Sequence, residues 1–246
     1  MSEIRKKSHI EIERNPIERF LMYVKDFLKI NSRKVIYSAV FIFALFSLSL
    51  TAYLLLTKSS ENDMIRLEVI IDNYSKSVRE SNVGAASQNT LSGSASMSEA
   101  NNKTIQELNN LISDTKFGFV HKISHYWLGN ILFEEKRYNE AFNAFDTFIK
   151  KSSDGVFVPI AINKAAICLE EDGKIENAIA LLSEYTAGSK NKIVMDQMYY
   201  NLGRLYLLNN NQIKARDAFK YVVEEYPQSA YAARSRERLF LISAVK

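Results

Sequence analysis

The 246-residue sequence has few of the residue types from which metal sites, disulfides and nucleophilic centres are built. Cys168 is its one cysteine, so neither an intrachain disulfide nor a cysteine zinc set can form. Of its three histidines, His121 and His125 share a helical spacing that could hold a metal, but no further ligands or H-E-x-x-H glutamate accompany them. We therefore expect Cys168 to be a buried apolar residue, and we expect no metal and no other cofactor.

Catalytic and nucleotide-binding motifs are also missing from the sequence. No G-x-S-x-G, phosphate-cradling Gly loop or dinucleotide fingerprint occurs. The acidic run of Glu170, Glu171 and Asp172 comes directly before Gly173 and is typical of a solvated helix end. The sequence thus predicts no catalytic residues and a protein that is not an enzyme.

One long segment, residues 35–56, lacks charge, glycine and proline altogether: VIYSAVFIFALFSLSLTAYLLL. A helix of this length measures about 33 Å, which is enough to cross a hydrocarbon core of about 30 Å. Its hydroxyl side chains can bond to carbonyls one turn earlier, and Tyr37 and Tyr53 lie where rings favour the headgroup zone. We predict a single transmembrane helix.

The formal net charge of +4 lies entirely in residues 1–34. By the positive-inside rule this basic tail is cytoplasmic and the chain after the span is extracytoplasmic. A cleaved signal peptide is the alternative, but it would require an unusually long basic segment, and no A-x-A site follows. The sequence therefore predicts an uncleaved anchor.

The basic tail contains a second helical pattern beside the predicted span. Asn15 and Pro16 form a helix start, and apolar residues recur behind them at helical spacing. Such a basic amphipathic helix is suited to anionic lipid or to a membrane partner, unless it only extends the membrane helix inward. Residues 1–14 are expected to be disordered.

Beyond the span, residues 57–80 carry one apolar seam, which favours a helix that packs on its own domain over a coiled coil with a second copy. Residues 81–98 are uncharged and rich in Ser, Ala and Gly, and we expect a flexible loop there.

Helical patterns fill residues 99–246, and they repeat. Gly129, Ala166 and Gly203 are spaced 37 and 37 residues apart. Twelve residues after each stands an alanine, and four further on stands Phe145, Leu182 or Phe219. Small residues at the first two positions allow two antiparallel helices to approach closely, and the large residue fills the seam.

These residues, with Leu128-Gly129, Leu202-Gly203 and Pro227, resemble the tetratricopeptide repeat, a helix–turn–helix unit. The fold class is therefore expected to be all-α: a transmembrane helix followed by a tetratricopeptide-like array with terminal capping helices. The units are expected at about 120–155, 157–190 and 194–228, with a capping helix at 229–245. This motif is specific for a fold and says little about function.

A stacked array of this kind presents a surface lined by the first helix of each unit, which suits protein partners. By the repeat register, the lining residues are predicted to be Tyr126, Asn130, Phe133, Asn163, Ile167, Glu170, Tyr200, Arg204 and Leu207. The repeat domain has no excess of basic residues, so nucleic acid is not an expected partner. The sequence leaves homo-oligomerisation open.

The whole layout, a basic tail, one span, a Ser-rich break and repeats, is similar to the YfgM-like family of ancillary SecYEG translocon subunits. The resemblance implies a bacterial inner-membrane protein with periplasmic repeats that contact the translocon, periplasmic chaperones or exported client chains. The alternative rests on residues 224–239, EEYPQSAYAARSRERL, which resemble repeat ends of envelope-assembly and cell-division proteins.

Overall fold

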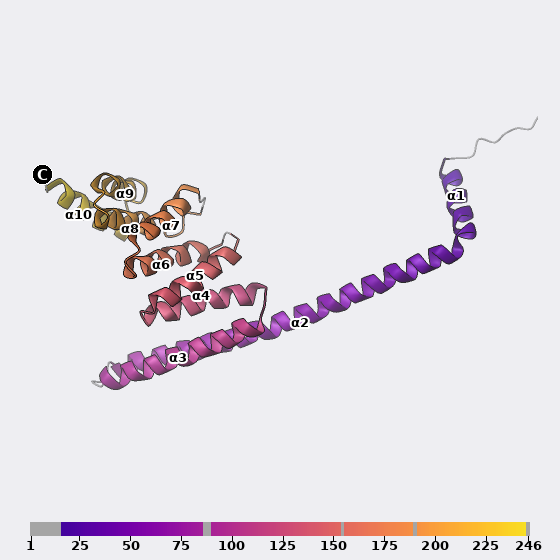
Figure 1. Ribbon diagram of the computed structural model, residues 1–246, viewed down its shortest axis with the longest axis horizontal. Coiled ribbons are helices and arrows are strands. Elements are labelled where there is room, and N and C mark those ends of the chain that lie inside the picture. Colours follow the sequence, from indigo (N-terminus) through magenta and orange to yellow (C-terminus); the bar gives the residue numbers. More distant parts are fainter. Residues whose placement is uncertain (1–15, 86–89, 154, 189–190, 245–246) are drawn as a thin grey trace, which may run out of the picture. The chain divides into compact units, whose positions relative to one another are not determined.

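The computed structural model describes residues 16–85, 90–153, 155–188 and 191–244. Within these ranges the side chains of 32, 35, 36, 39, 52–59, 82–85 and 90–96 are not described. The chain divides into two compact units, residues 1–59 and 60–246, which are considered separately (Figure 1). All regular elements in the described ranges are helices, α1 to α10.

The first unit contains α1 (Pro16–Ile30) and the beginning of α2 (Ser32–Ala85). Helix α1 starts with Pro16, whose fixed φ suits a first helical turn. It ends at Ile30, where the backbone N–H and the side-chain amide of Asn31 both donate to the Phe27 carbonyl. The apolar side chains of α1, including Ile17 and Phe20, are exposed.

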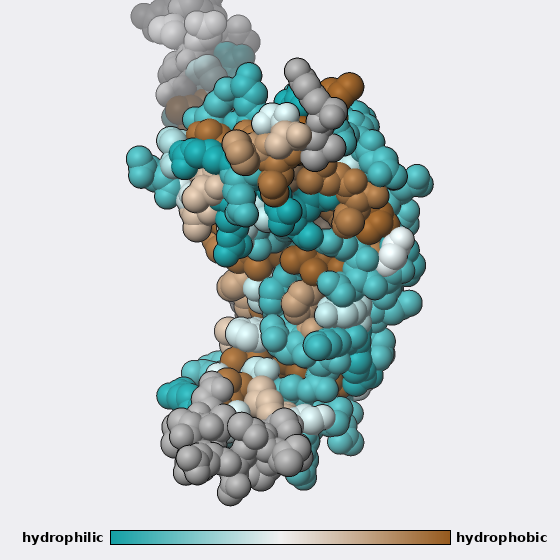
Figure 2. All heavy atoms as spheres, turned by 90° about the vertical axis from the view of Figure 1, so that its left-hand side faces the viewer, coloured by the Kyte–Doolittle hydropathy of each residue, from teal (hydrophilic) through white to brown (hydrophobic). Residues whose placement is uncertain are grey.

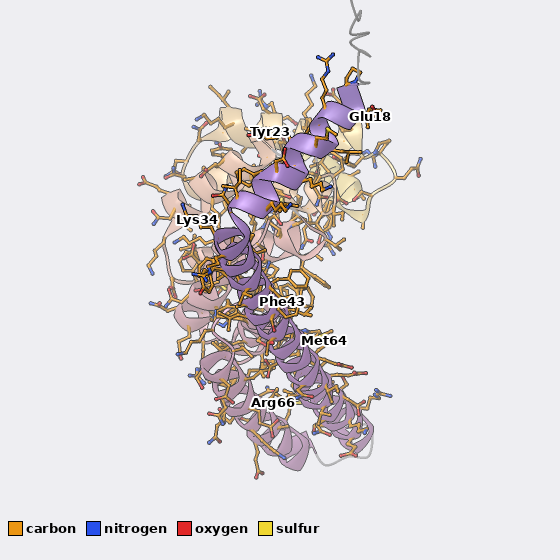
Figure 3. The ribbon with its side chains drawn as sticks, turned by 90° about the vertical axis from the view of Figure 1, so that its right-hand side faces the viewer. Glu18, Tyr23, Lys34, Phe43, Met64 and Arg66 are labelled. Carbon is orange, nitrogen blue, oxygen red and sulfur yellow. The ribbon has the colours of Figure 1, made fainter. Side chains whose placement is uncertain are left out.

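Helix α2 exposes large apolar residues along residues 40–50, among them Phe43 with 72% of its surface accessible (Figure 3). Ser38 and Thr51 donate to the Lys34 and Ser47 carbonyls at 2.8 Å, the back-bonding expected from the sequence. Among the described residues, none of the helices combines the length and the apolar character that crossing a membrane requires. Part of segment 35–56 lies outside the described side chains, and the predicted span remains a prediction.

The second unit begins with the later part of α2, which packs along α3 (Thr90–Asp114). Leu67 and Ile70 from α2 share one core with Leu108 and Leu111 from α3. The guanidinium of Arg66 reaches the Asp114 carboxylate at 2.7 Å. Of the apolar seam in residues 57–80, Leu67 is buried in its own unit and Ile71 and Tyr74 pack partly buried against the same core, while Met64 is 45% exposed.

The structure corrects the expectation of a flexible loop at 81–98. Helix α2 continues to Ala85 and α3 begins at Thr90, so the helices extend into both ends of this stretch, and residues 86–89 lie outside the description. Low hydrophobicity suggested a loop, but the stretch has no proline and therefore no residue that prevents the helices from continuing.

Three antiparallel helix pairs and a final helix complete the second unit. The pairs are α4 (Phe119–Glu134) with α5 (Tyr138–Lys151), α6 (Phe157–Glu171) with α7 (Ile175–Gly188), and α8 (Met195–Leu208) with α9 (Gln212–Glu225); α10 (Ala230–Ala244) follows. These pairs fall in the expected ranges, and α10 buries Ala232 and Ile242 against the last pair. The array is therefore all-α and of the tetratricopeptide type.

The repeating glycines act where the two helices of a pair approach. A Cβ on Gly129 would lie 2.7 Å from Cδ1 of Phe145, and one on Gly203 would lie 2.5 Å from Cε1 of Phe219. Both rings are fully buried. Each ring thus fills the seam within its own unit, and only glycine leaves space for it.

The turn inside each pair repeats one backbone feature. Lys136, Gly173 and Asn210 adopt φ angles of 57°, 73° and 56°. Their spacing is the same 37 residues as that of the anchors, so the repeat is expressed in the backbone as well as in the core.

Candidate protein-binding surface

The face formed by α4, α6 and α8 contains the nine residues predicted to line a binding surface, and three of them are buried. Tyr126 packs against Phe157 with ring centroids 4.9 Å apart, and Tyr200 packs against Tyr231 at 5.3 Å. Asn163 is 3% exposed and accepts a 2.9 Å hydrogen bond from Asn201. These three residues hold the units together and are not available to a partner.

Three further predicted residues pair with a neighbouring unit. The Asn130 amide oxygen accepts from Lys164 Nζ at 2.5 Å. Arg204 donates to both oxygens of Glu170, at 3.0 and 2.6 Å. Each contact joins residues 34 apart on successive first helices, so it fixes the stacking of one unit on the next.

The remaining predicted residues, Phe133, Ile167 and Leu207, are half-buried. Lys164 Nζ lies 5.1 Å from the centre of the Phe133 ring, and burial lowers the pKa of this ammonium group. The structure thus places all nine residues on one face but assigns most of them to internal contacts. Their role in binding remains a prediction.

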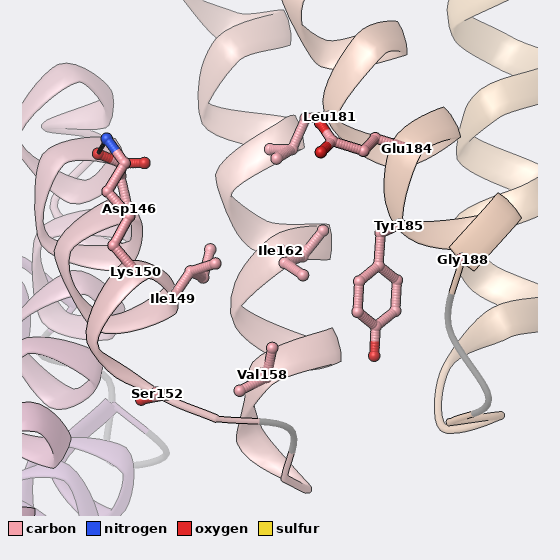
Figure 4. A pocket seen from close by; sticks show the side chains of 10 residues that line it. All are labelled: Asp146, Ile149, Lys150, Ser152, Val158, Ile162, Leu181, Glu184, Tyr185 and Gly188. Atoms are coloured by element: carbon pink, nitrogen blue, oxygen red, sulfur yellow. Dashed lines mark hydrogen bonds and ion pairs between the residues drawn. The ribbon is translucent and has the colours of Figure 1, made fainter.

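A different surface of the second unit carries a groove. A groove of about 760 Å³ lies between α5 and α7, with α6 as its floor (Figure 4). Val158 and Ile162 from α6 form the floor, while Ile149 and Leu181 contribute apolar walls. Its size is within the range of pockets that hold ligands or short peptide segments.

The polar groups of the groove are few and lie at defined places. Lys150 donates to Asp146 at 2.7 Å on one wall, and Glu184 lies on the other. The hydroxyl of Tyr185 is buried and has no hydrogen-bond partner among the described residues.

The repeat pattern does not indicate this groove, because it identifies the first helices and the small-residue positions of the units. Its walls come from Ile149, Leu181 and Tyr185 on second helices, outside the small-residue positions that define the repeat. The sequence does contain one indication of the groove. Helices α5 and α7 carry more large apolar residues than the contact between the two helices of each unit needs.

Cys168 and His121 are buried, whereas His125 is half-buried and Glu171 of the acidic run is exposed. Cys168 is fully buried, and burial raises the pKa of its thiol to about 12. The rings of His121 and His125 meet edge to face at 4.9 Å. Within the described part of the chain, no three or more His, Cys, Asp or Glu residues are gathered as a metal would require.

The helix pairs, their glycine-ring seams and their repeating turns define a tetratricopeptide-type helical repeat protein. In agreement, residues 197–229 match the model of the tetratricopeptide repeat, TPR_6. No curated protein sequence matches the chain.

Three solved structures are similar to the chain, and the first of them supports the same fold. The chain is similar to MamA, with a TM-score of 0.50, 15% identity, and coverage of 62% of this chain and 82% of that one. A tetratricopeptide repeat protein from Parabacteroides merdae ATCC 43184 has a TM-score of 0.49 and 14% identity, over 70% of this chain and 61% of that chain. YrrB, titled a TPR protein with an unusual peptide-binding site, is 14% identical with a TM-score of 0.28, over 67% and 97%. The first of these likenesses shows the fold alone.

Proposed function

We propose that the protein is a membrane-anchored adaptor that binds other proteins through its repeat array. The observation that carries this proposal is the groove between α5 and α7, which is open, has an apolar floor and is built from two successive units. Repeat arrays of stacked helices provide surfaces of this kind for peptides and partner helices.

The groove favours a short apolar segment of another protein. Val158 and Ile162 offer an apolar floor to apolar side chains, and the walls add Ile149, Leu181 and Tyr185. Asp146 is already paired with Lys150, which leaves Glu184 to favour a basic residue in the occupant. An extended segment with apolar residues flanked by a Lys or Arg meets these requirements.

We place the adaptor in a bacterial inner membrane, with residues 35–56 as an uncleaved anchor and the repeats on the periplasmic side. Support comes from the uncharged run and from the positive charge confined to residues 1–34. The resemblance to the YfgM-like family favours the Sec translocon, periplasmic chaperones or exported chains as partners. Cell-wall synthases or outer-membrane assembly factors are the partners under the alternative.

Affinity purification from detergent-solubilised membranes tests the proposal. Ile149→Glu places a charge on the groove wall, and Ile213→Glu makes the same change at an exposed site on α9. We expect the first variant to lose the partners that the wild type and the second variant retain, with Ile149→Leu retaining them too. Equal recovery by all variants, with unfolding temperatures unchanged, would exclude the groove.

A further inference from the structure

Three turns that connect successive pairs lie on one edge of the second unit, because the helices alternate in direction. The turns α5–α6 and α7–α8 are joined by a hydrogen bond from the Asn191 amide to the Gly155 carbonyl at 3.4 Å. The Arg66–Asp114 ion pair holds the beginning of this unit's part of α2 beside the α3–α4 turn. We name this surface the entry edge: residues 114–119, 151–153, 155–157 and 191–193.

The entry edge exposes large apolar side chains at each of its turns. Phe117 and Phe119 are 73% and 56% exposed, Val156 is 58% exposed and Ile193 is 38% exposed. Val156 and Ile193 are related by the 37-residue period, so the feature recurs with the repeat. A single exposed apolar residue is ordinary, but a row of them along one edge indicates an interaction surface.

An exposed lysine accompanies the apolar residues at every one of these turns: Lys116, Lys151 and Lys192. Among the described carboxylates near these lysines, Asp114 is paired with Arg66 and Asp146 with Lys150. The entry edge therefore combines apolar tips with positive charge, which is the chemistry of a surface that lies on anionic lipid.

The other turns of the unit differ. The turns inside the pairs, seen from their side in Figure 2, consist of polar residues and glycine at 135–137, 172–174 and 209–211. Leu208 and Ile213 are the exposed large apolar residues beside them in the described sequence. The α9–α10 turn lies on the same edge by the same alternation, but it follows two exposed acids, Glu224 and Glu225, and is not part of the entry edge. Among the turns inside the pairs, the α8–α9 turn also places an exposed lysine, Lys214, beside exposed apolar residues. The entry edge differs in that the combination recurs at three successive turns.

We propose that the entry edge lies on the surface of an anionic lipid bilayer, with Phe117, Phe119 and Val156 among the headgroups and the three lysines beside lipid phosphates. This inference rests on the proposed anchor. The predicted span ends at residue 56, the second unit begins at Ser60, and Arg66 of that unit pairs with Asp114 at this edge. Ser152, which belongs to the entry edge, and Gly188 both line the groove. A segment bound in the groove would then lie close to the membrane.

The test uses the full chain in vesicles, with an environment-sensitive nitrobenzoxadiazole probe on Ser153→Cys in the α5–α6 turn. Native Cys168 is fully buried and does not compete for the label. Asn209→Cys carries the control probe near Leu208 and Ile213. In vesicles containing phosphatidylglycerol we expect blue-shifted emission and roughly twofold greater intensity at 153 than in phosphatidylcholine alone, and no change at 209.

Replacing Lys116, Lys151 and Lys192 with glutamine is expected to remove the difference at 153 while the circular dichroism of the chain is unchanged. Resistance of the chain to carbonate extraction measures the anchor separately. If carbonate does not extract the chain but the probe at 153 stays exposed to water, the lipid contact of the entry edge is wrong and the anchor is retained. If carbonate extracts the chain, yet it floats with anionic vesicles and shows the blue shift, the anchor is wrong and the lipid contact is retained. If carbonate extracts the chain and no blue shift is seen, both proposals are wrong. A blue shift that requires added membrane protein overturns the edge in favour of a protein partner.

Discussion

At the scale of single residues, Gly203 is the described glycine at which an added Cβ would lie closest to a side chain, 2.5 Å from Cε1 of Phe219. We expect Gly203→Ala to lower the free energy of unfolding by about 1–3 kcal/mol, because the new methyl group meets a buried ring that has no space to move. Intrinsic helix propensity works in the opposite direction, by about 1 kcal/mol, so the sign of the effect reports the clash.

Urea unfolding followed by circular dichroism measures this change. Gly188→Ala is the matched control, since a Cβ at Gly188 has nothing within 4 Å. It should leave stability unchanged or slightly higher. A Gly203→Ala chain as stable as the wild type would mean that the α8–α9 seam is looser than described.

His125 gives the array a dependence on pH. Burial, with smaller effects of His121 and Lys151, lowers the pKa of His125 to about 4. The unfolded chain takes up this proton near pH 6.5 and the folded chain does not, so stability is full above about pH 6.5 and declines as pH falls toward about 4. We expect His125→Gln to flatten this decline, measured as the difference in unfolding temperature from the wild type across that window. Parallel curves for the two proteins would contradict the assignment.

At the scale of elements, the turn inside each pair requires a left-handed residue. Lys136 has φ of 57° where the next unit has Gly173 at 73°. We expect Lys136→Gly to stabilise the array by about 0.5–1 kcal/mol, since glycine adopts this conformation without steric cost. Gly173→Ala should destabilise it by about 1–2 kcal/mol. Thermal unfolding of both variants measures these two changes in stability. Changes of the same sign would show that the turns do not require a left-handed residue.

The contact between α6 and α8 depends on the Glu170–Arg204 pair. Both side chains are partly shielded, with 14% and 32% of their surfaces exposed. A double-mutant cycle with Glu170→Gln and Arg204→Met is expected to give a coupling energy of about 1–2 kcal/mol. The exposed Lys220–Glu224 pair should give a coupling within a few tenths of a kcal/mol. Equal couplings would show that the pair does not fix the stacking of the units.

The element pattern could be predicted well because small and large residues recur at fixed offsets. Gly129 and Gly203 located the helix pairs, and Pro16 located the start of α1. The helices at 81–98 could not be predicted, because the low hydrophobicity of the stretch favoured a loop. The contact between Ser81 and Met97 that joins the two helices depends on tertiary packing. The side-chain partners of Tyr126, Asn163 and Glu170 depend on how one unit stacks on the next, which a single-unit register does not contain.

At the scale of the whole molecule, the account requires the repeats and the basic tail to be in different compartments. We expect protease added to intact spheroplasts to degrade residues 60–246, because the positive charge confined to residues 1–34 orients the chain. An epitope at the N-terminus should survive this treatment, and it should be degraded when protease is added to inside-out vesicles. The reverse pattern would place the repeats in the cytoplasm and remove the periplasmic partners.

Site-specific photocrosslinking in intact cells tests the adaptor role most directly. A photoreactive amino acid at Glu184 lies on the groove wall, and one at Glu225 lies at the exposed end of α9. The account predicts discrete crosslinked proteins from position 184, their loss in the Ile149→Glu variant and none from position 225. The same products from both positions, or none from position 184, would contradict it.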